Sequence, residues 1–309
     1  MAECEPIWRR LAGYLAALAS GLIMGVSWVV FKLQLNVEAL GPADVNWLNM
    51  LGVGIIIVPV YLIRYRGRLF PAGQPYPWLL LFAVSAAGIF YLRNVGVDLT
   101  GATTSAIVAR SETAFVFILT YVVLRERVRA LGWLGTVLLL VGALHTVGIG
   151  STELSFPIAG VIALIAAALL IALNALIIKL HFGGVRNEMA ILASAVVQTV
   201  IFSVVVPVFV GLDGLRHVLA HPPLIGLIAL AAATIVANLF LYYYAMKRAP
   251  MWAVRVLALV AIPTAVAGDY FVLGAPITMN AVQGMLLVII GALVIIQAGR
   301  GRATAEQPC

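Results

Sequence analysis

The feature that most constrains this fold is a series of ten long apolar runs separated by short connections. Each run has about the 20 residues that a helix needs to cross the hydrocarbon core of a bilayer. Only 10% of the 309 residues are charged, against about 25% in a soluble domain. We therefore predict an all-α membrane protein of ten transmembrane helices, at residues 11–33, 45–64, 77–99, 103–124, 131–150, 157–180, 188–210, 223–246, 252–273 and 279–298.

The first run begins like a secretory signal, because the basic residues Arg9 and Arg10 precede an apolar stretch. The stretch continues past Val30 and further runs follow, so we predict an uncleaved first helix, with cleavage as the alternative. The two cysteines, Cys4 and Cys309, lie in the tails and support neither a disulfide framework nor a thiolate metal site.

The basic residues cluster in the connections and predict the orientation of the chain. With the N-terminus inside, fourteen Lys and Arg residues fall at inner ends and two, Lys32 and Arg216, at outer ends. Cytoplasmic loops carry such an excess, so we expect both termini to be cytoplasmic. The net charge of +7 thus reflects topology, and no basic, aromatic-rich surface predicts a nucleic-acid partner.

The two halves of the chain are similar in sequence. At an offset of 149 residues, GTVLLLVGALHTVGIG (135–150) aligns with GMLLVIIGALVIIQAG (284–299), with six identities. A chance match between two Leu-, Gly- and Ala-rich helices is the alternative. We predict a first five-helix repeat at 1–150 and a second at 151–309, inverted because five is odd. Inverted repeats are typical of transporters, with the solute site near the midplane between the halves.

The sequence resembles the drug/metabolite transporter superfamily, specifically its EamA-type ten-helix exporters. The resemblance rests on the ten runs, the two halves, TYVVLRERV (120–128) with the acidic Glu126, and AIPTAVAGDYFVLGAP (261–276) with the helical Pro263. Ala114 and Ala275 depart from the pattern, at the first-half proline and second-half acidic positions. The resemblance implies a central cavity, a bacterial inner membrane, and often export of amino acids or other small metabolites. The superfamily includes amino-acid exporters of the YddG type.

Arg93, Arg110 and Glu112 are charges within predicted spans, where charge is expensive and functional by default. A hairpin turn near Gly101 places both arginines about 13 Å deep and Glu112 about 16 Å deep. Residues two apart on a helix point about 200° apart, so Arg110 and Glu112 are expected not to neutralise each other. We predict that the three bind a carboxylate- or phosphate-bearing solute, with Glu112 holding an ammonium group or a coupling proton. The alternative is a structural network in which Glu112 bridges to Arg93 and Arg110 reaches carbonyl groups or Asp98.

Other polar, aromatic and proline residues within the runs complete the candidate set. Packing alone is the alternative for the polar and aromatic candidates, and a static kink is the alternative for each proline. The further solute-binding candidates are Tyr91, Asn94, Trp28, Asn174, Asn238 and Tyr242; the further proton-coupling candidates are His145 and Asp269; the hinge candidates are Pro59, Pro207 and Pro263.

These features predict a secondary transporter, an exporter of small metabolites such as amino acids, working by alternating access around a midplane cavity. A proton-linked antiporter and a passive facilitator both remain open. A channel-like facilitator or a lipid flippase is the alternative, and a membrane-embedded enzyme fits less well. The chain has no GxxxxGK[ST] pattern and no room for a soluble catalytic domain, so we expect no enzyme activity and no cofactor. The expected partners are a small-molecule solute and the lipid bilayer, and no oligomeric state is predicted.

Overall fold

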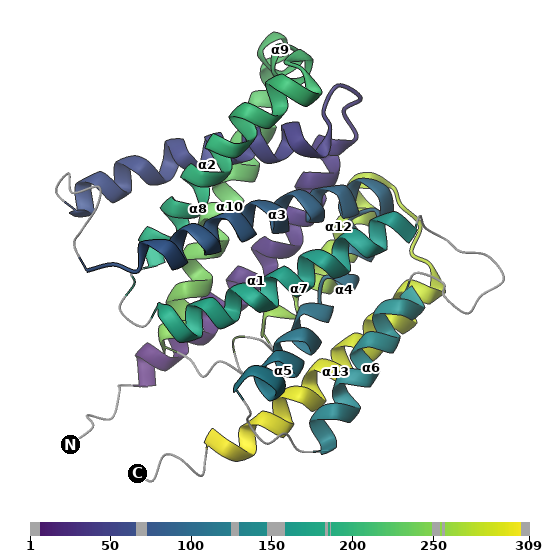
Figure 1. Cartoon of the computed structure of the whole chain (residues 1–309). Helices are drawn as coiled ribbons and strands as arrows, with labels where there is room; N and C mark the ends of the chain where they lie inside the picture. Colours follow the sequence, from purple (N-terminus) through teal and green to yellow (C-terminus); the bar gives the residue numbers. More distant parts are fainter. Residues whose placement is uncertain are drawn as a thin grey trace.

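The computed structural model describes residues 7–65, 73–124, 130–146, 158–182, 185, 187–248, 254 and 257–303, and every regular element within these ranges is a helix (Figure 1). The elements of the first half are α1 (Ile7–Leu35), α2 (Pro42–Tyr65), α3 (Tyr76–Thr100), α4 (Ala102–Val108), α5 (Ser111–Leu124) and α6 (Ala130–Thr146). Those of the second half are α7 (Ile158–His181), α8 (Asn187–Val205), the π-helical turn η1 (Val206–Val210), α9 (Asp213–Ala220), α10 (Pro222–Arg248), α12 (Ala261–Leu273) and α13 (Met279–Ala303).

Much of the chain is long and apolar enough to cross a membrane. Seven such helical segments lie within the described residues, and three shorter apolar helices accompany them. The spanning candidates are Leu11–Leu35, Pro42–Ile63, Tyr76–Thr100, Ala102–Val123, Ile158–Ile178, Glu188–Val210 and Pro222–Ala245, and the shorter helices are Ala130–Thr146, Ala261–Leu273 and Met279–Ile295.

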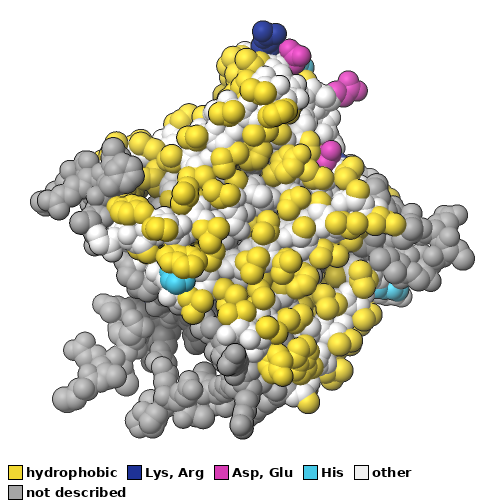
Figure 2. Space-filling model, in the orientation of Figure 1, with side chains coloured by type: hydrophobic (Ala, Val, Ile, Leu, Met, Phe, Trp, Pro, Cys, Tyr) yellow, Lys and Arg dark blue, Asp and Glu magenta, His cyan; other side chains and the backbone are white. Residues whose placement is uncertain are grey.

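The surface of the molecule is apolar where a soluble protein would be polar. Large hydrophobic side chains such as Ile63 and Phe271 are each 81% exposed. Figure 2 shows hydrophobic side chains spread over the visible face, with charged side chains gathered near α9 at one end. Contiguous apolar surface of this extent marks contact with another apolar phase, and lipid is the phase that fits helices of this length. The chain is therefore a multi-pass membrane protein.

Two of the predicted spans are interrupted. The run at 103–124 forms α4 and α5, with non-helical Ala109 and Arg110 between them. In the run at 252–273, α12 begins only at Ala261, after a turn at Leu259 and Val260. Residues 251–253 and 255–256 lie outside the described residues, as do 147–150 and 157 at the ends of other runs.

The two interruptions have different local causes. Proline lacks an N–H and clashes with the carbonyl four residues earlier, so Pro263 prevents a helical bond to Leu259. The Leu259 carbonyl instead accepts from the backbone N–H of Ile262, at 3.0 Å. The first interruption contains no proline. There, the N–H of Arg110 donates to the carbonyl of Ile107 at 3.1 Å, a three-residue turn that ends α4.

The helices pack in pairs that link the two halves. Helix α1 packs along α10 and α3 along α7, while α2 packs on α8 and α6 on α13. Figure 1 shows α6 and α13 lying side by side. A Cβ atom added at Gly135 would lie 2.7 Å from the carbonyl oxygen of Gly291, and one at Gly142 would lie 2.9 Å from that of Gly284. These glycines therefore allow the two backbones to approach closely, in antiparallel directions.

The glycine contacts are reciprocal under the 149-residue offset. The offset maps Gly135 onto Gly284 and Gly142 onto Gly291, so each glycine contacts the counterpart of the other. A two-fold relation between halves produces this reciprocity. The division into repeats at 1–150 and 151–309 stays a prediction that these contacts favour.

Candidate functional site

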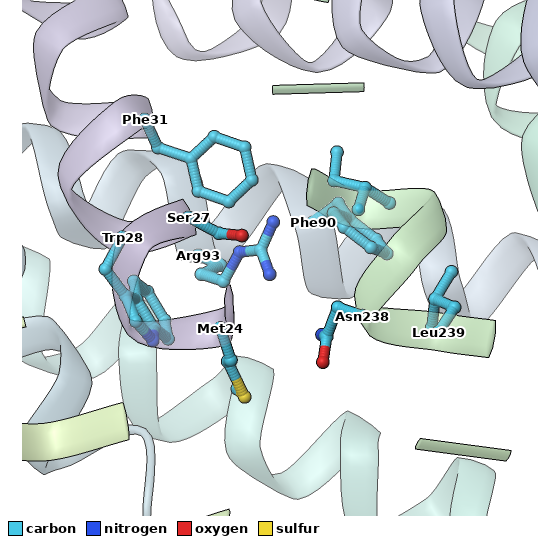
Figure 3. A pocket seen from close by; sticks show the side chains of 9 residues that line it. Met24, Ser27, Trp28, Phe31, Phe90, Arg93, Asn238 and Leu239 are labelled. Carbon is cyan, nitrogen blue, oxygen red and sulfur yellow. The ribbon is translucent and has the colours of Figure 1, made fainter. Parts of the chain in front are cut away.

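A small cavity of about 30 Å³ lies between α1, α3 and α10. Its walls combine residues far apart in the sequence, and Figure 3 shows them around the guanidinium of Arg93. The lining residues are Met24, Ser27, Trp28 and Phe31 of α1, Phe90 and Arg93 of α3, and Ile235, Asn238 and Leu239 of α10. Three of the predicted solute-binding residues, Trp28, Arg93 and Asn238, thus come together at one site.

Arg93 is held among aromatic rings. Its Cζ atom lies 4.3 Å from the ring centroid of Phe90, 4.4 Å from that of Phe31 and 5.3 Å from that of Trp28. Cations are attracted to ring faces at such distances, by about 0.5–2 kcal/mol each. Its Nε and Nη2 atoms are enclosed, and within the part of the chain that the structure describes neither has a hydrogen-bond partner. The rings thus hold the guanidinium in place without neutralising it.

The remaining polar groups of the cavity are neutral and partly engaged. Ser20 on α1 donates its hydroxyl hydrogen to Oδ1 of Asn238, at 2.6 Å, which orients that amide. Ser27 donates its hydroxyl hydrogen to the carbonyl of Ile23, at 2.9 Å. The Nδ2 donor of Asn238 and the lone pairs of Ser27 Oγ therefore remain for a solute.

Arg110 and Glu112 do form an ion pair, so the expectation from helical geometry is wrong. Nη1 of Arg110 lies 3.9 Å from Oε1 of Glu112, and both side chains are buried. The 200° separation holds only inside a continuous helix, and Arg110 occupies the interruption between α4 and α5. Neither residue lines the cavity, although Nη2 of Arg110 lies 3.5 Å from Sδ of Met24, which does.

Arg110 also connects the two interrupted spans. Its Nη2 donates to the carbonyl of Ala258, at 3.2 Å, just before the turn that precedes α12. On the neighbouring face of α1, added Cβ atoms at Gly21 and Gly25 would lie 2.9 Å from the carbonyl of Leu257 and 2.7 Å from that of Ala261. The GxxxG spacing therefore serves close packing of α1 against the second interruption.

The other predicted solute-binding residues lie away from the cavity. The ring of Tyr91 packs 5.9 Å from that of Phe202 on α8, and Tyr242 packs against Tyr243. Asn174 donates from Nδ2 to the carbonyl of Phe82, at 3.3 Å. Asn94 is buried, and its Oδ1 has no partner within the described ranges.

The predicted proton-coupling and hinge residues are spread over several helices of the structure. His145 lies near the end of α6 with Nε2 2.8 Å from Oε1 of Gln283. The buried carboxylate of Asp269 accepts a hydrogen bond from the backbone N–H of Thr103, at the start of α4. The prolines lie inside α2 (Pro59), in the π-helical turn η1 (Pro207) and in the first turn of α12 (Pro263).

Sequence reasoning missed the apolar walls of the cavity, which are Met24, Phe31, Phe90, Ile235 and Leu239. Helical spacing carries a signal for two of them, since Phe31 lies three residues after Trp28 and Phe90 three before Arg93. Residues three apart share a helix face. In the described ranges, no three His, Cys, Asp or Glu side chains form a group that could hold a metal ion.

Comparison with known proteins gives one family match and one similar solved structure. No curated protein matches the sequence. A solved protein, described only as "Crystal structure of protein", is 18% identical, with a TM-score of 0.61 over 94% of this chain and 99% of that chain, and this likeness shows the fold alone. The EamA-like transporter family matches residues 11–148, which include α1 and α3 of the cavity. Residues 11–148 are therefore similar in sequence to the EamA-like transporter family.

Proposed function

We propose that this protein is a secondary transporter that moves a small metabolite through the cavity around Arg93. The observation that carries the proposal is the enclosed guanidinium of Arg93, whose Nε and Nη2 have no partner within the described residues. A charge inside a membrane protein is costly unless a partner neutralises it. A solute that arrives and departs supplies such a partner transiently, and the family match at residues 11–148 favours transport over catalysis.

The position of the cavity supports alternating access. Its walls come from α1 and α3 in the first half of the chain and from α10 in the second half. A solute bound there contacts both halves, so rocking of one half against the other exposes it to each side in turn. The interruptions before α5 and α12 lie one in each half of the chain. We further propose that the protein has ten membrane-spanning helices in two inverted repeats. It lies in a bacterial inner membrane, with both termini in the cytoplasm.

Export of a small metabolite is the direction that the family resemblance favours, and amino acids are only one of the solute classes that it implies. The reciprocal contacts of α6 and α13 support the inverted repeats that such an exporter requires. In the structure described here, the cavity of about 30 Å³ is smaller than any such solute. We therefore propose that the cavity widens when solute enters.

Counterflow in proteoliposomes tests the proposal. Purified protein is reconstituted with an unlabelled panel of amino acids and organic acids inside, and uptake of the labelled compounds is measured. We expect saturable exchange of at least one compound, reduced tenfold or more in Arg93→Gln. Arg216→Gln is the matched control, because Arg216 is exposed on α9 and pairs only with the exposed Asp213 in the described structure. Unsaturable flux without counterflow would indicate a channel instead, and absence of flux for the whole panel contradicts the proposal.

A further inference from the structure

The contacts of Arg93 narrow the solute to one chemical class. Building on the transport function proposed above, we infer that the cavity binds a small organic monocarboxylate with an apolar body and discriminates against the corresponding amino-acid zwitterion. The inference rests on three features of the cavity: one edge of the guanidinium without a hydrogen-bond partner in the described residues, aromatic rings next to it, and no acidic residue among the described residues of the lining.

The unpartnered edge of Arg93 matches a carboxylate. Nε and Nη2 lie on the same edge of the planar guanidinium, and both lack a partner in the described part of the chain. Two parallel N–H groups on such an edge bind the two oxygens of one carboxylate. A single guanidinium neutralises one negative charge, and Arg93 is the only charged residue among the described residues that line the cavity. A monoanion therefore fits better than a phosphate with two charges.

Aromatic rings lie next to the guanidinium and leave little polar surface around it. Phe31 and Phe90 lie 4.4 and 4.3 Å from Cζ. Beyond them the walls are the side chains of Met24, Ile235 and Leu239. A solute whose carboxylate meets Arg93 therefore places the rest of its structure against apolar and aromatic surface, where a hydrocarbon or aromatic body is stabilised by burial.

An ammonium group has no anionic partner at this site. Among the described residues, no Asp or Glu belongs to the cavity lining, and Glu112 pairs with Arg110 at 3.9 Å outside that lining. Of the polar side chains discussed above, the neutral hydroxyl oxygen of Ser27 is the acceptor that remains, because Asn238 Oδ1 already accepts from Ser20. Binding a zwitterion would neutralise Arg93 and bring a second charge into the same apolar enclosure, where an uncompensated charge is unfavourable.

Three probes that share one apolar body separate these possibilities. We would measure binding of 3-phenylpropanoate, L-phenylalanine and 3-phenylpropylamine to the purified full-length protein by isothermal titration calorimetry at pH 7. We expect the carboxylate to bind at least tenfold more tightly than the zwitterion, with the amine weakest. Equal or tighter binding of the zwitterion overturns the inference, and so does absence of binding by the carboxylate.

Two variants locate the effect at the cavity. Arg93→Gln should weaken carboxylate binding tenfold or more. The carboxylate affinity of Arg93→Lys should lie between those of the wild type and Arg93→Gln, because an ammonium keeps the charge and lacks the two-donor edge. Asn238→Asp keeps the acceptor for Ser20 and adds a negative charge. It should therefore weaken binding of the carboxylate tenfold and strengthen binding of the amine. This second variant tests the inference even if Arg93→Gln does not fold. Arg216→Gln should bind all three probes as the wild type does.

The transport function and the solute class can fail separately. Carboxylate binding that follows this pattern, without exchange of 3-phenylpropanesulfonate in proteoliposomes, would contradict transport and leave the solute class standing. The sulfonate is used for flux because it stays ionised and does not cross the bilayer as a neutral acid. Saturable exchange of phenylalanine that carboxylates do not inhibit would support transport and overturn the solute class.

Discussion

The guanidinium of Arg110 joins the two interrupted spans of the protein through the carbonyl of Ala258, which accepts from Nη2 at 3.2 Å. The interruptions occupy equivalent positions, because helix ends at residues 108 and 258 and resumes at 111 and 261, an offset of 150 in both cases. An arginine at one interruption thus hydrogen-bonds a carbonyl at the other. Buried charge that makes such contacts fixes geometry, so we assign Arg110 a structural role and Arg93 the binding role.

The ion pair of Arg110 and Glu112 should appear as a coupling energy. We expect Arg110→Gln and Glu112→Gln each to lower the unfolding temperature, and the double variant to lose less than the sum of the two. Residues in direct contact typically couple by about 0.5–3 kcal/mol, and this pair is buried at 3.9 Å. Thermal unfolding of the four proteins in detergent measures the cycle. Additive losses would contradict a direct interaction.

The glycine contacts of α6 and α13 predict a sharp difference between two Gly→Ala variants. A Cβ at Gly291 would lie 2.5 Å from the backbone nitrogen of Leu139, so we expect Gly291→Ala to destabilise the protein by about 1–3 kcal/mol. Gly54 in α2 has no atom within 4 Å of the same position, so Gly54→Ala should cost nothing and serves as the control. Unfolding temperatures in detergent compare the two. Equal stability of both variants would contradict the close approach.

The sequence was sufficient to predict apolar helices, the turn at Gly101 and three residues of the cavity, because these depend on local composition and spacing. Gly101 has φ +87°, a conformation that glycine adopts without steric cost. Trp28, Arg93 and Asn238 combine polarity with an intramembrane position, which is rare enough to single them out. Tyr91 and Tyr242 share that property and nevertheless pack elsewhere, since rotation of a helix about its axis depends on its neighbours.

The interruption at Arg110 was not predictable from local rules. Pro263 marks the second interruption directly, whereas the equivalent position in the first half is Ala114, a good helix former. The first interruption instead accompanies a tertiary contact, the bond from Arg110 to Ala258, which joins residues 148 positions apart. A geometric argument based on a continuous helix consequently failed for Arg110 and Glu112, and only the arrangement of α4, α5 and α12 corrects it.

Asp269 should matter for stability through the start of α4. Its buried carboxylate accepts from the backbone N–H of Thr103, one of the donors that a helix leaves unpaired at its N-terminus. We expect Asp269→Ala to cost about 0.5–2 kcal/mol and Asp269→Asn less, because an amide oxygen still accepts. Asp213→Ala is the control, since Asp213 forms an exposed pair with Arg216 whose contribution is near zero. A larger loss for Asp213 than for Asp269 in thermal unfolding would contradict this role.

The buried amides Gln34 and Asn49 should act as a matched pair between α1 and α2. Nε2 of Gln34 donates to Oδ1 of Asn49 at 2.8 Å, and Nδ2 of Asn49 donates to Oε1 of Gln34 at 2.9 Å. Both residues are 1% exposed, so removing one partner leaves the other amide buried without these two bonds. We expect Asn49→Leu or Gln34→Leu alone to cost about 1–3 kcal/mol.

The double variant distinguishes a pair from two independent groups. Replacing both amides by leucine removes both desolvated polar groups together, so the double variant should be more stable than either single variant. Bonds between membrane helices average only about 0.6 kcal/mol, so the double variant should lie close to the wild type. Unfolding temperatures of the four proteins in detergent measure the effect. A double variant less stable than both single variants would show that the amides stabilise the helices separately, through contacts other than the two bonds between them.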